Sequence, residues 1–148
     1  MATAAIVGDS CLALNPGRVD DLPREESVIK GIKFVSIAVR DQDRALEFYT
    51  KKLGMRIITD APFDGTQRWI ELGIPRADTK LVLFTMQGHD QLIGKFQNVT
   101  FVTDDVAGTV KELKARGVEF TREPETEDWG TSACFKDQDG NIFVLSTP

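Results

Sequence analysis

The sequence contains few of the residues that build disulfide scaffolds and metal sites. Its 148 residues include two cysteines, Cys11 and Cys134, and one histidine, His89. The cysteines lie far apart and form no CxxC pair, so neither a disulfide framework nor a zinc knuckle is predicted. We therefore expect reduced thiols and a cytoplasmic location.

Long apolar runs and an excess of positive charge are also missing from the sequence. No stretch approaches the roughly 18 apolar residues that a membrane-spanning helix requires. The start of the chain lacks the basic residues of a secretory signal, and Gly8 and Asp9 interrupt its apolar character. Acidic residues outnumber basic ones by 23 to 18, which disfavours binding to nucleic acid. We expect neither a membrane nor a nucleic-acid partner.

The composition changes near residue 30. Residues 15–27 are dense in proline, glycine and charge, which is typical of a linker. We interpret 1–30 as an appendage, either disordered or lying along a partner, and 31–148 as the folded domain. A chain of this length can bury about 70% of its unfolded surface, enough for a core without disulfides or a structural metal.

The folded part contains an internal repeat. Two of its segments align so that Asp41 falls opposite Asp105 and Gly54 falls opposite Gly117. In each copy an apolar alternation gives way to a helical period, which predicts a strand followed by a helix. The aspartates are N-cap candidates, and the glycines occupy the place of a left-handed residue at a helix C-terminus.

Three short β-like runs follow each predicted helix, and Asp139–Gly140 is a hairpin turn signal rather than part of a calcium loop. The chain is therefore predicted to be an α+β protein of two tandem βαβββ modules, residues 31–88 and 95–148. The runs begin at Met55, Thr66 and Thr79 in the first module and at Val118, Gly130 and Asn141 in the second.

Alternation within the strands separates a helix-facing side from a second side of mixed character. Val35 and Ile37 are predicted to pack on the helix, which leaves Phe34 and Ser36 on the other side. A mixed face fits a concave ligand cavity, and it equally fits a second core or a dimer seam. The predicted cavity surface comprises Phe34, Ser36, Trp69, Glu71, Val82, Phe84, Asn98, Thr100 and Val144.

Glu71 is the carboxylate that alternation places on this surface. Next to Trp69 we expect burial to raise its pKa, which suits a catalytic acid or base. The alternative is a solvated glutamate, or one paired with an arginine such as Arg68. We expect Cys134 to fill the core and His89 to be a solvated residue between the modules.

Two motifs in the sequence resemble the vicinal oxygen chelate superfamily, which includes glyoxalase I, extradiol dioxygenases and bleomycin resistance proteins. They are V-x-D-x-x-x-A-L-x-F-Y-x-x-x-L-G at 39–54 and F-x-D-x-D-G-N at 135–141. The resemblance implies two modules that form a half-open barrel around a cavity, often completed by homodimerisation. We therefore expect a homodimer.

Catalytic members of that superfamily hold a divalent ion with His, Glu or Gln at equivalent strand positions. The resemblance puts these positions at Phe34, near Val82, at Asn98 and at Val144. Phenyl and isopropyl groups cannot ligate such an ion, and one amide is not a site. We predict no metal site and no cofactor.

An acidic stretch, 123–128, precedes Trp129. Its composition is typical of a solvated loop. Its placement also resembles the ligand-facing loop of bleomycin resistance proteins. Those members sequester a cationic, partly aromatic drug between the subunits of a dimer. In that case Trp129 or Phe63 would stack on the ligand.

The leading prediction is a metal-free member of this superfamily that binds a small organic molecule in the barrel cavity and sequesters it. One alternative is a metal-dependent lyase or dioxygenase of the same superfamily, similar to lactoylglutathione lyase. The other is a non-catalytic interaction or scaffold protein whose cavity is filled.

Overall fold

The computed structural model describes residues 28–85 and 87–148, so Cys11 and most of the predicted appendage lie outside the described residues. In the unit Ile32–Pro148 the predicted order of elements occurs twice, once in each module. Module one contains β1 (Phe34–Ala38), α2 (Gln42–Glu47), the π-helical turn η2 (Phe48–Lys52), β2 (Arg56–Pro62), β3 (Arg68–Gly73) and β4 (Lys80–Phe84). After the short helix η3 (Asp90–Leu92), module two contains β5 (Phe96–Val102), α3 (Val106–Ala115), β6 (Glu119–Glu127), β7 (Gly130–Lys136) and β8 (Ile142–Ser146).

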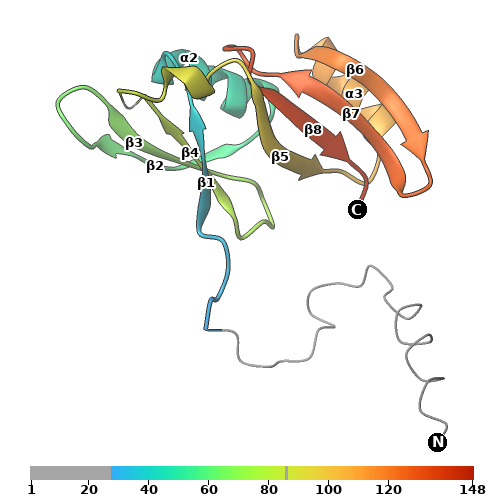
Figure 1. The fold of residues 1–148 in the computed structure, drawn as a ribbon, viewed down its shortest axis with the longest axis horizontal. Coiled ribbons are helices and arrows are strands. Elements are labelled where there is room, and N and C mark those ends of the chain that lie inside the picture. The colour runs from blue at the N-terminus through green and yellow to red at the C-terminus, as the bar shows by residue number, and fades with distance from the viewer. Residues whose placement is uncertain (1–27, 86) are drawn as a thin grey trace, which may run out of the picture. The chain divides into compact units, whose positions relative to one another are not determined.

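The two modules share one sheet topology. Sheet one has the strand order β1-β4-β3-β2 and sheet two the order β5-β8-β7-β6 (Figure 1). The first strand of each module pairs in parallel with the last, and the other pairs are antiparallel. This confirms the predicted α+β fold of tandem βαβββ modules, in which the sheets form a half-open barrel. Within the described ranges no helix is long and apolar enough to cross a bilayer.

The ends of both helices follow the predicted signals. The Asp41 carboxylate accepts backbone N–H groups of Asp43 and Arg44 at 2.9 and 3.1 Å, and the Asp105 carboxylate accepts that of Gly108 at 3.0 Å. These bonds satisfy helix N–H groups that have no partner within the helix.

The secondary structure of the acidic stretch 123–128 differs from the prediction. Strand β6 runs to Glu127, so most of this stretch is an edge strand rather than a loop. Its residues pair with β7, Glu125 opposite Ser132 and Thr126 opposite Thr131. Pro124 is tolerated because it lies on an edge strand next to a register shift, where its missing N–H breaks no ladder.

The main core lies between the sheets and the helices. Ile37, Leu72 and Leu83 of sheet one are fully buried there with Tyr49, and Phe143 of sheet two joins the same cluster. This confirms the predicted helix-facing side of the strands. The prediction for Cys134 was wrong, because this residue is half-buried and does not belong to the core cluster.

Both sequence motifs meet at the junction of the modules. The Tyr49 hydroxyl donates to a carboxylate oxygen of Asp137 at 2.7 Å, and the Asn141 amide donates to the Ala38 carbonyl at 3.0 Å. Asp137 also accepts the backbone N–H groups of Asp139 and Asn141, which closes the β7–β8 turn. Burial raises the pKa of Asp137 and, together with the nearby carboxylate, that of Tyr49. The motifs therefore hold the two modules together.

Candidate functional site

The face of sheet one that points away from the helices, here called its open face, is built by β1, β3 and β4. Ser36 and Glu71 both lie opposite Val82 in the strand register. Val82 is 1% exposed although it lies outside the main core cluster. The side chains of the open face therefore cover one another and form a second, smaller packed layer.

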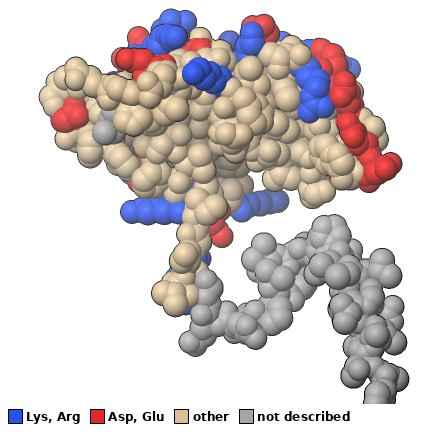
Figure 2. All heavy atoms as spheres, viewed as in Figure 1, with Lys and Arg blue, Asp and Glu red and all other residues tan. Residues whose placement is uncertain are grey.

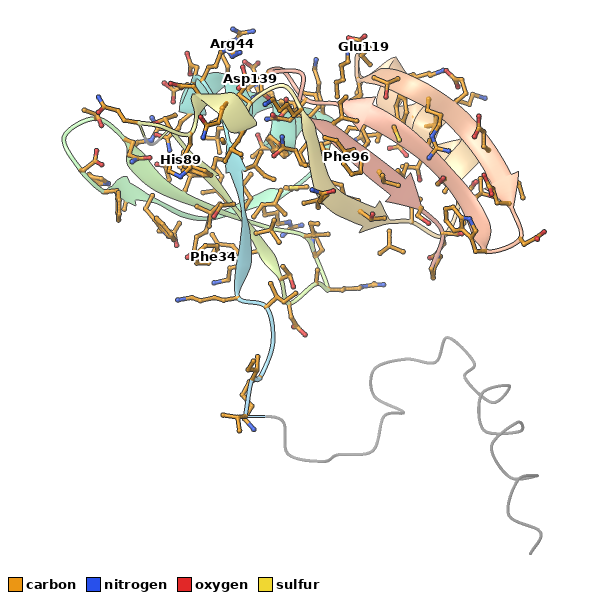
Figure 3. All side chains as sticks on the ribbon, in the orientation of Figure 1. Phe34, Arg44, His89, Phe96, Glu119 and Asp139 are labelled. Atoms are coloured by element: carbon orange, nitrogen blue, oxygen red, sulfur yellow. The ribbon has the colours of Figure 1, made fainter. Side chains whose placement is uncertain are left out.

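Three aromatic side chains dominate this layer, and we call them the aromatic cluster: Phe34, Phe63 and Trp69. The Phe34 and Trp69 rings meet edge to face with centroids 5.5 Å apart, and Phe63 lies 5.5 Å from Trp69 on another side. Phe63 is 57% exposed. Such a cluster offers aromatic faces and edges, with the polar Trp69 Nε1 beside them, against which a ligand ring can pack. Figure 3 shows Phe34 on β1.

Glu71 lies beside the aromatic cluster with both carboxylate oxygens occupied. Trp69 Nε1 donates to Oε1 at 3.0 Å, and Lys80 Nζ lies 3.1 Å from Oε2. The hydrogen bond from Trp69, and then that from Lys80, lower the pKa of Glu71 against a smaller opposing effect of burial. The expected rise in pKa was wrong, because burial is outweighed by donors to the charged form.

The predicted arginine partner of Glu71 was also wrong. Arg68 instead bridges Asp43 and Asp60, each at 2.8 Å, and Lys80 takes its place beside Glu71. Sequence reasoning missed Lys80. It lies two residues before Val82, so the same alternation that selected Val82 would have placed it on the open face.

His89 lies at the edge of sheet one, beyond the end of β4 (Figure 3). Its ring meets Phe84 edge to face at 5.4 Å, and Nδ1 is 3.3 Å from the Gln87 carbonyl oxygen. It does lie between the modules, as predicted, but it is half-buried against Phe84 rather than fully solvated.

The open face of sheet two is more polar. Asn98 and Thr100 are exposed, and Thr100 lies opposite the half-buried Val144. Arg122, which sequence reasoning missed, donates to Ser132 Oγ at 2.8 Å. No local pattern identifies Arg122 as part of this surface, because its position depends on the register between β6 and β7.

Trp129 lies at the turn between β6 and β7 and is 62% exposed. It lines a hollow of about 490 Å³ with Glu125, Thr126, Glu127 and Asp128. Figure 2 shows acidic side chains gathered in a stripe over β6. The predicted residues thus fall into one group on each sheet, with Trp129 at the hairpin.

The four positions at which the superfamily holds a divalent ion do not fit one in this chain. Phe34 and Val82 on sheet one and Val144 on sheet two offer no oxygen or imidazole ligand, and Asn98 is exposed. Within 28–85 and 87–148 no three His, Cys, Asp or Glu side chains gather in a way that could hold a metal ion.

Comparison with known proteins agrees with this fold. Residues 31–145 match the Glyoxalase/Bleomycin resistance protein/Dioxygenase superfamily. Paired βαβββ modules with an open concave side define this class of protein. The chain belongs to that superfamily.

Three similar proteins show how varied the superfamily is. YetH of Bacillus subtilis is 38% identical over 121 residues, which cover 80% of this chain and 98% of YetH. The crystal structure of TnmS3, an antibiotic binding protein from Streptomyces sp. CB03234, is 31% identical with a TM-score of 0.74, covering 82% of this chain and 98% of TnmS3. A probable chloroplastic lactoylglutathione lyase of Arabidopsis thaliana is 34% identical over 114 residues, covering 72% of this chain but 33% of that protein.

Proposed function

We propose that the chain binds and sequesters a small organic molecule that carries an aromatic ring and a positive charge, held on the open face of sheet one. The observation that carries this proposal is the aromatic cluster packed beside the Glu71 carboxylate. Aromatic rings stack with flat ligands and attract cations, and the net charge of −5 favours the approach of a cation to the chain. The similarity to an antibiotic binding protein supports a small-molecule ligand.

In this proposal Glu71 serves binding by holding the Trp69 ring in place through Nε1, and it has no role in proton transfer. Both of its oxygens already accept hydrogen bonds, and its lowered pKa keeps it ionised at neutral pH. A general acid must carry a proton near the operating pH and a general base needs a pKa close to it, so a lowered pKa opposes both roles. The site also works without a divalent ion, because Phe34, Val82 and Val144 supply no ligand atoms for one.

In this proposal a second copy of the chain covers the open face of sheet one. Phe63 is 57% exposed next to the open face of sheet one, and Phe96 on β5 is 49% exposed. Exposed apolar side chains become buried when a second copy covers them, which favours association where they lie in one patch. A homodimer that joins an open face of one copy to an open face of the other would enclose a ligand between them.

Calorimetric titration of the full chain with doxorubicin, a flat aromatic compound with one ammonium group, tests the proposal. Saturable binding is expected, and Trp69→Leu should weaken it about tenfold or more because the stacking surface is lost. Glu71→Gln should weaken binding, whereas the matched change Glu119→Gln on exposed β6 should leave it within twofold. Binding that is indifferent to Trp69→Leu and Glu71→Gln would overturn the site.

The similarity to a lactoylglutathione lyase supports a second candidate, a metal-dependent lyase. The hemithioacetal of methylglyoxal and glutathione, supplied with nickel or zinc, distinguishes the two. Turnover that a chelator abolishes would establish the lyase and refute sequestration. No turnover above the buffer rate is expected.

A further inference from the structure

The junction of the two modules contains a cavity of about 300 Å³ that the proposed function does not use. Module one contributes Met55, just after its helical segment, and Ile74 in the turn between β3 and β4. Module two contributes Phe101 from β5 and Leu113 from α3. No residue of the aromatic cluster lines this cavity, so it is separate from the open face of sheet one.

The lining of this junction cavity is apolar and uncharged. Phe135 and Leu145 contribute buried side chains to the lining, at 2% and 4% exposure, whereas Val102 at its rim is 68% exposed. None of the lining residues is charged. Its polar side chains are Thr103 and Thr109, whose hydroxyls are hydrogen-bonded to each other at 2.8 Å.

We infer that the junction cavity is a second ligand site, which takes a small, uncharged, largely hydrocarbon molecule of one or two fused rings. Its volume lies at the lower end of the range of about 300–1,000 Å³ found for small-molecule pockets. A charged ligand would lose its hydration without gaining a partner charge. While bonded to each other, the two threonine hydroxyls still offer one hydrogen and an acceptor lone pair to a polar atom of a neutral ligand.

A second copy of the chain fits this cavity poorly. A stable protein interface needs about 800 Å² from each partner, with a polar rim around its apolar centre. A hollow of 300 Å³ has room for a single ring system rather than for a face of that size. We therefore assign the cavity to a small molecule.

Methyl NMR of the full chain with 2-naphthol, a neutral probe with one hydroxyl, tests this assignment. Saturable shifts are expected at the methyl groups of Met55, Leu113 and Leu145, but not at those of Val82 and Val144 on the open faces. The anionic analogue 2-naphthalenesulfonate should produce no such shifts. Shifts at Val82 or Val144 alone, or equal binding of both probes, would overturn the inference without touching the proposed function.

A substitution that fills the cavity gives an independent readout. Ala77 lines the cavity from the exposed β3–β4 turn, where its N–H donates to the Ile74 carbonyl at 3.0 Å whatever the side chain. Ala77→Leu should therefore fold normally and weaken 2-naphthol binding about tenfold or more. Ala107→Leu, the same change at an exposed α3 position outside the cavity, should leave binding unchanged.

Two further outcomes would refute the assignment. Unchanged 2-naphthol affinity in Ala77→Leu would place the probe elsewhere. Cavity methyl signals that shift with protein concentration in the absence of probe would show that a second copy occupies the cavity instead.

Discussion

Tyr49 links the two modules through one buried hydrogen bond. Tyr49 and Asn141 are fully buried and Asp137 is 6% exposed, so neither water nor a nearby cation replaces a lost partner. The carboxylate is held by donors from Tyr49, from the side-chain amide of Asn141 and from the backbone of its own turn. Without the Tyr49 hydroxyl, Asp137 Oδ2 keeps only the Asn141 amide as donor, so part of the desolvation cost of the buried carboxylate is no longer offset.

Tyr49→Phe should therefore lower the free energy of unfolding by about 1–3 kcal/mol, as for other buried hydrogen bonds to a charged group. Urea unfolding at neutral pH measures this loss. Asp137→Asn and the double variant complete a cycle, whose coupling energy reports the Tyr49–Asp137 bond itself. Additive losses in the double variant would contradict a direct link.

Asp64 provides a pH dependence with a known sign. The backbone N–H of Thr66, followed by the Gln67 and Thr66 side chains, lowers the pKa of Asp64 from 3.8 to about 2. Because the folded-state pKa is the lower one, the ionised group stabilises the fold above pH 3.8, and this contribution is lost as the pH falls toward 2.

Carboxyl NMR should therefore show Asp64 titrating near pH 2. Asp64→Asn, which cannot ionise, should unfold more readily than the parent chain above pH 4, and the difference should shrink on acidification. A titration midpoint at 3.8 would mean that the loop does not hold the carboxylate as described.

At the scale of elements, the repeat made the helices predictable. Asp41 and Asp105 cap their helices, and Gly54 and Gly117 have φ of 77° and 85°, so aligning two weak signals identified both helix ends. The π-helical turn Phe48–Lys52 was missed because its residues also suit an ordinary α-helix.

Strand β6 could be predicted only in part from the sequence. Glu123, Pro124 and Glu125 disfavour a strand locally, and pairing with β7 overrides that preference. The candidate site, too, could be predicted only in part. Alternation found Trp69 and Glu71, but the contacts that set the charge state of Glu71 depend on how neighbouring strands align.

Gly54→Ala tests the helix end. Its φ of 77° is costly for any residue with a Cβ atom, although the nearest neighbour of that atom, Arg116 Nη1, is at an ordinary 3.9 Å. Destabilisation of about 1–2 kcal/mol is expected from backbone strain alone. Gly65→Ala is the matched control, since its φ is ordinary and no atom lies within 4 Å. Equal effects of the two changes on thermal unfolding would argue against strain at Gly54.

At the scale of the whole molecule, the half-open form of the barrel connects ligand binding to assembly. The open face of sheet one covers Val82 with its own side chains, whereas sheet two leaves Asn98 and Thr100 exposed. If a second copy covers the open face of sheet one, as we propose, a ligand held between the copies binds the dimer more tightly than the single chain.

Ligand binding and dimerisation must then favour each other, because a ligand that binds the dimer more tightly shifts the monomer–dimer equilibrium toward the dimer. Sedimentation velocity should show the proportion of dimer rising when doxorubicin is added, and the apparent affinity for doxorubicin should fall as the chain is diluted below its dimer dissociation constant. Trp69→Leu should abolish the effect of doxorubicin on assembly, whereas Glu119→Gln, on the exposed strand β6, should preserve it. Tight binding to a chain that stays monomeric at every concentration would show that the open face of sheet one is sufficient, and would remove the second copy from the proposal.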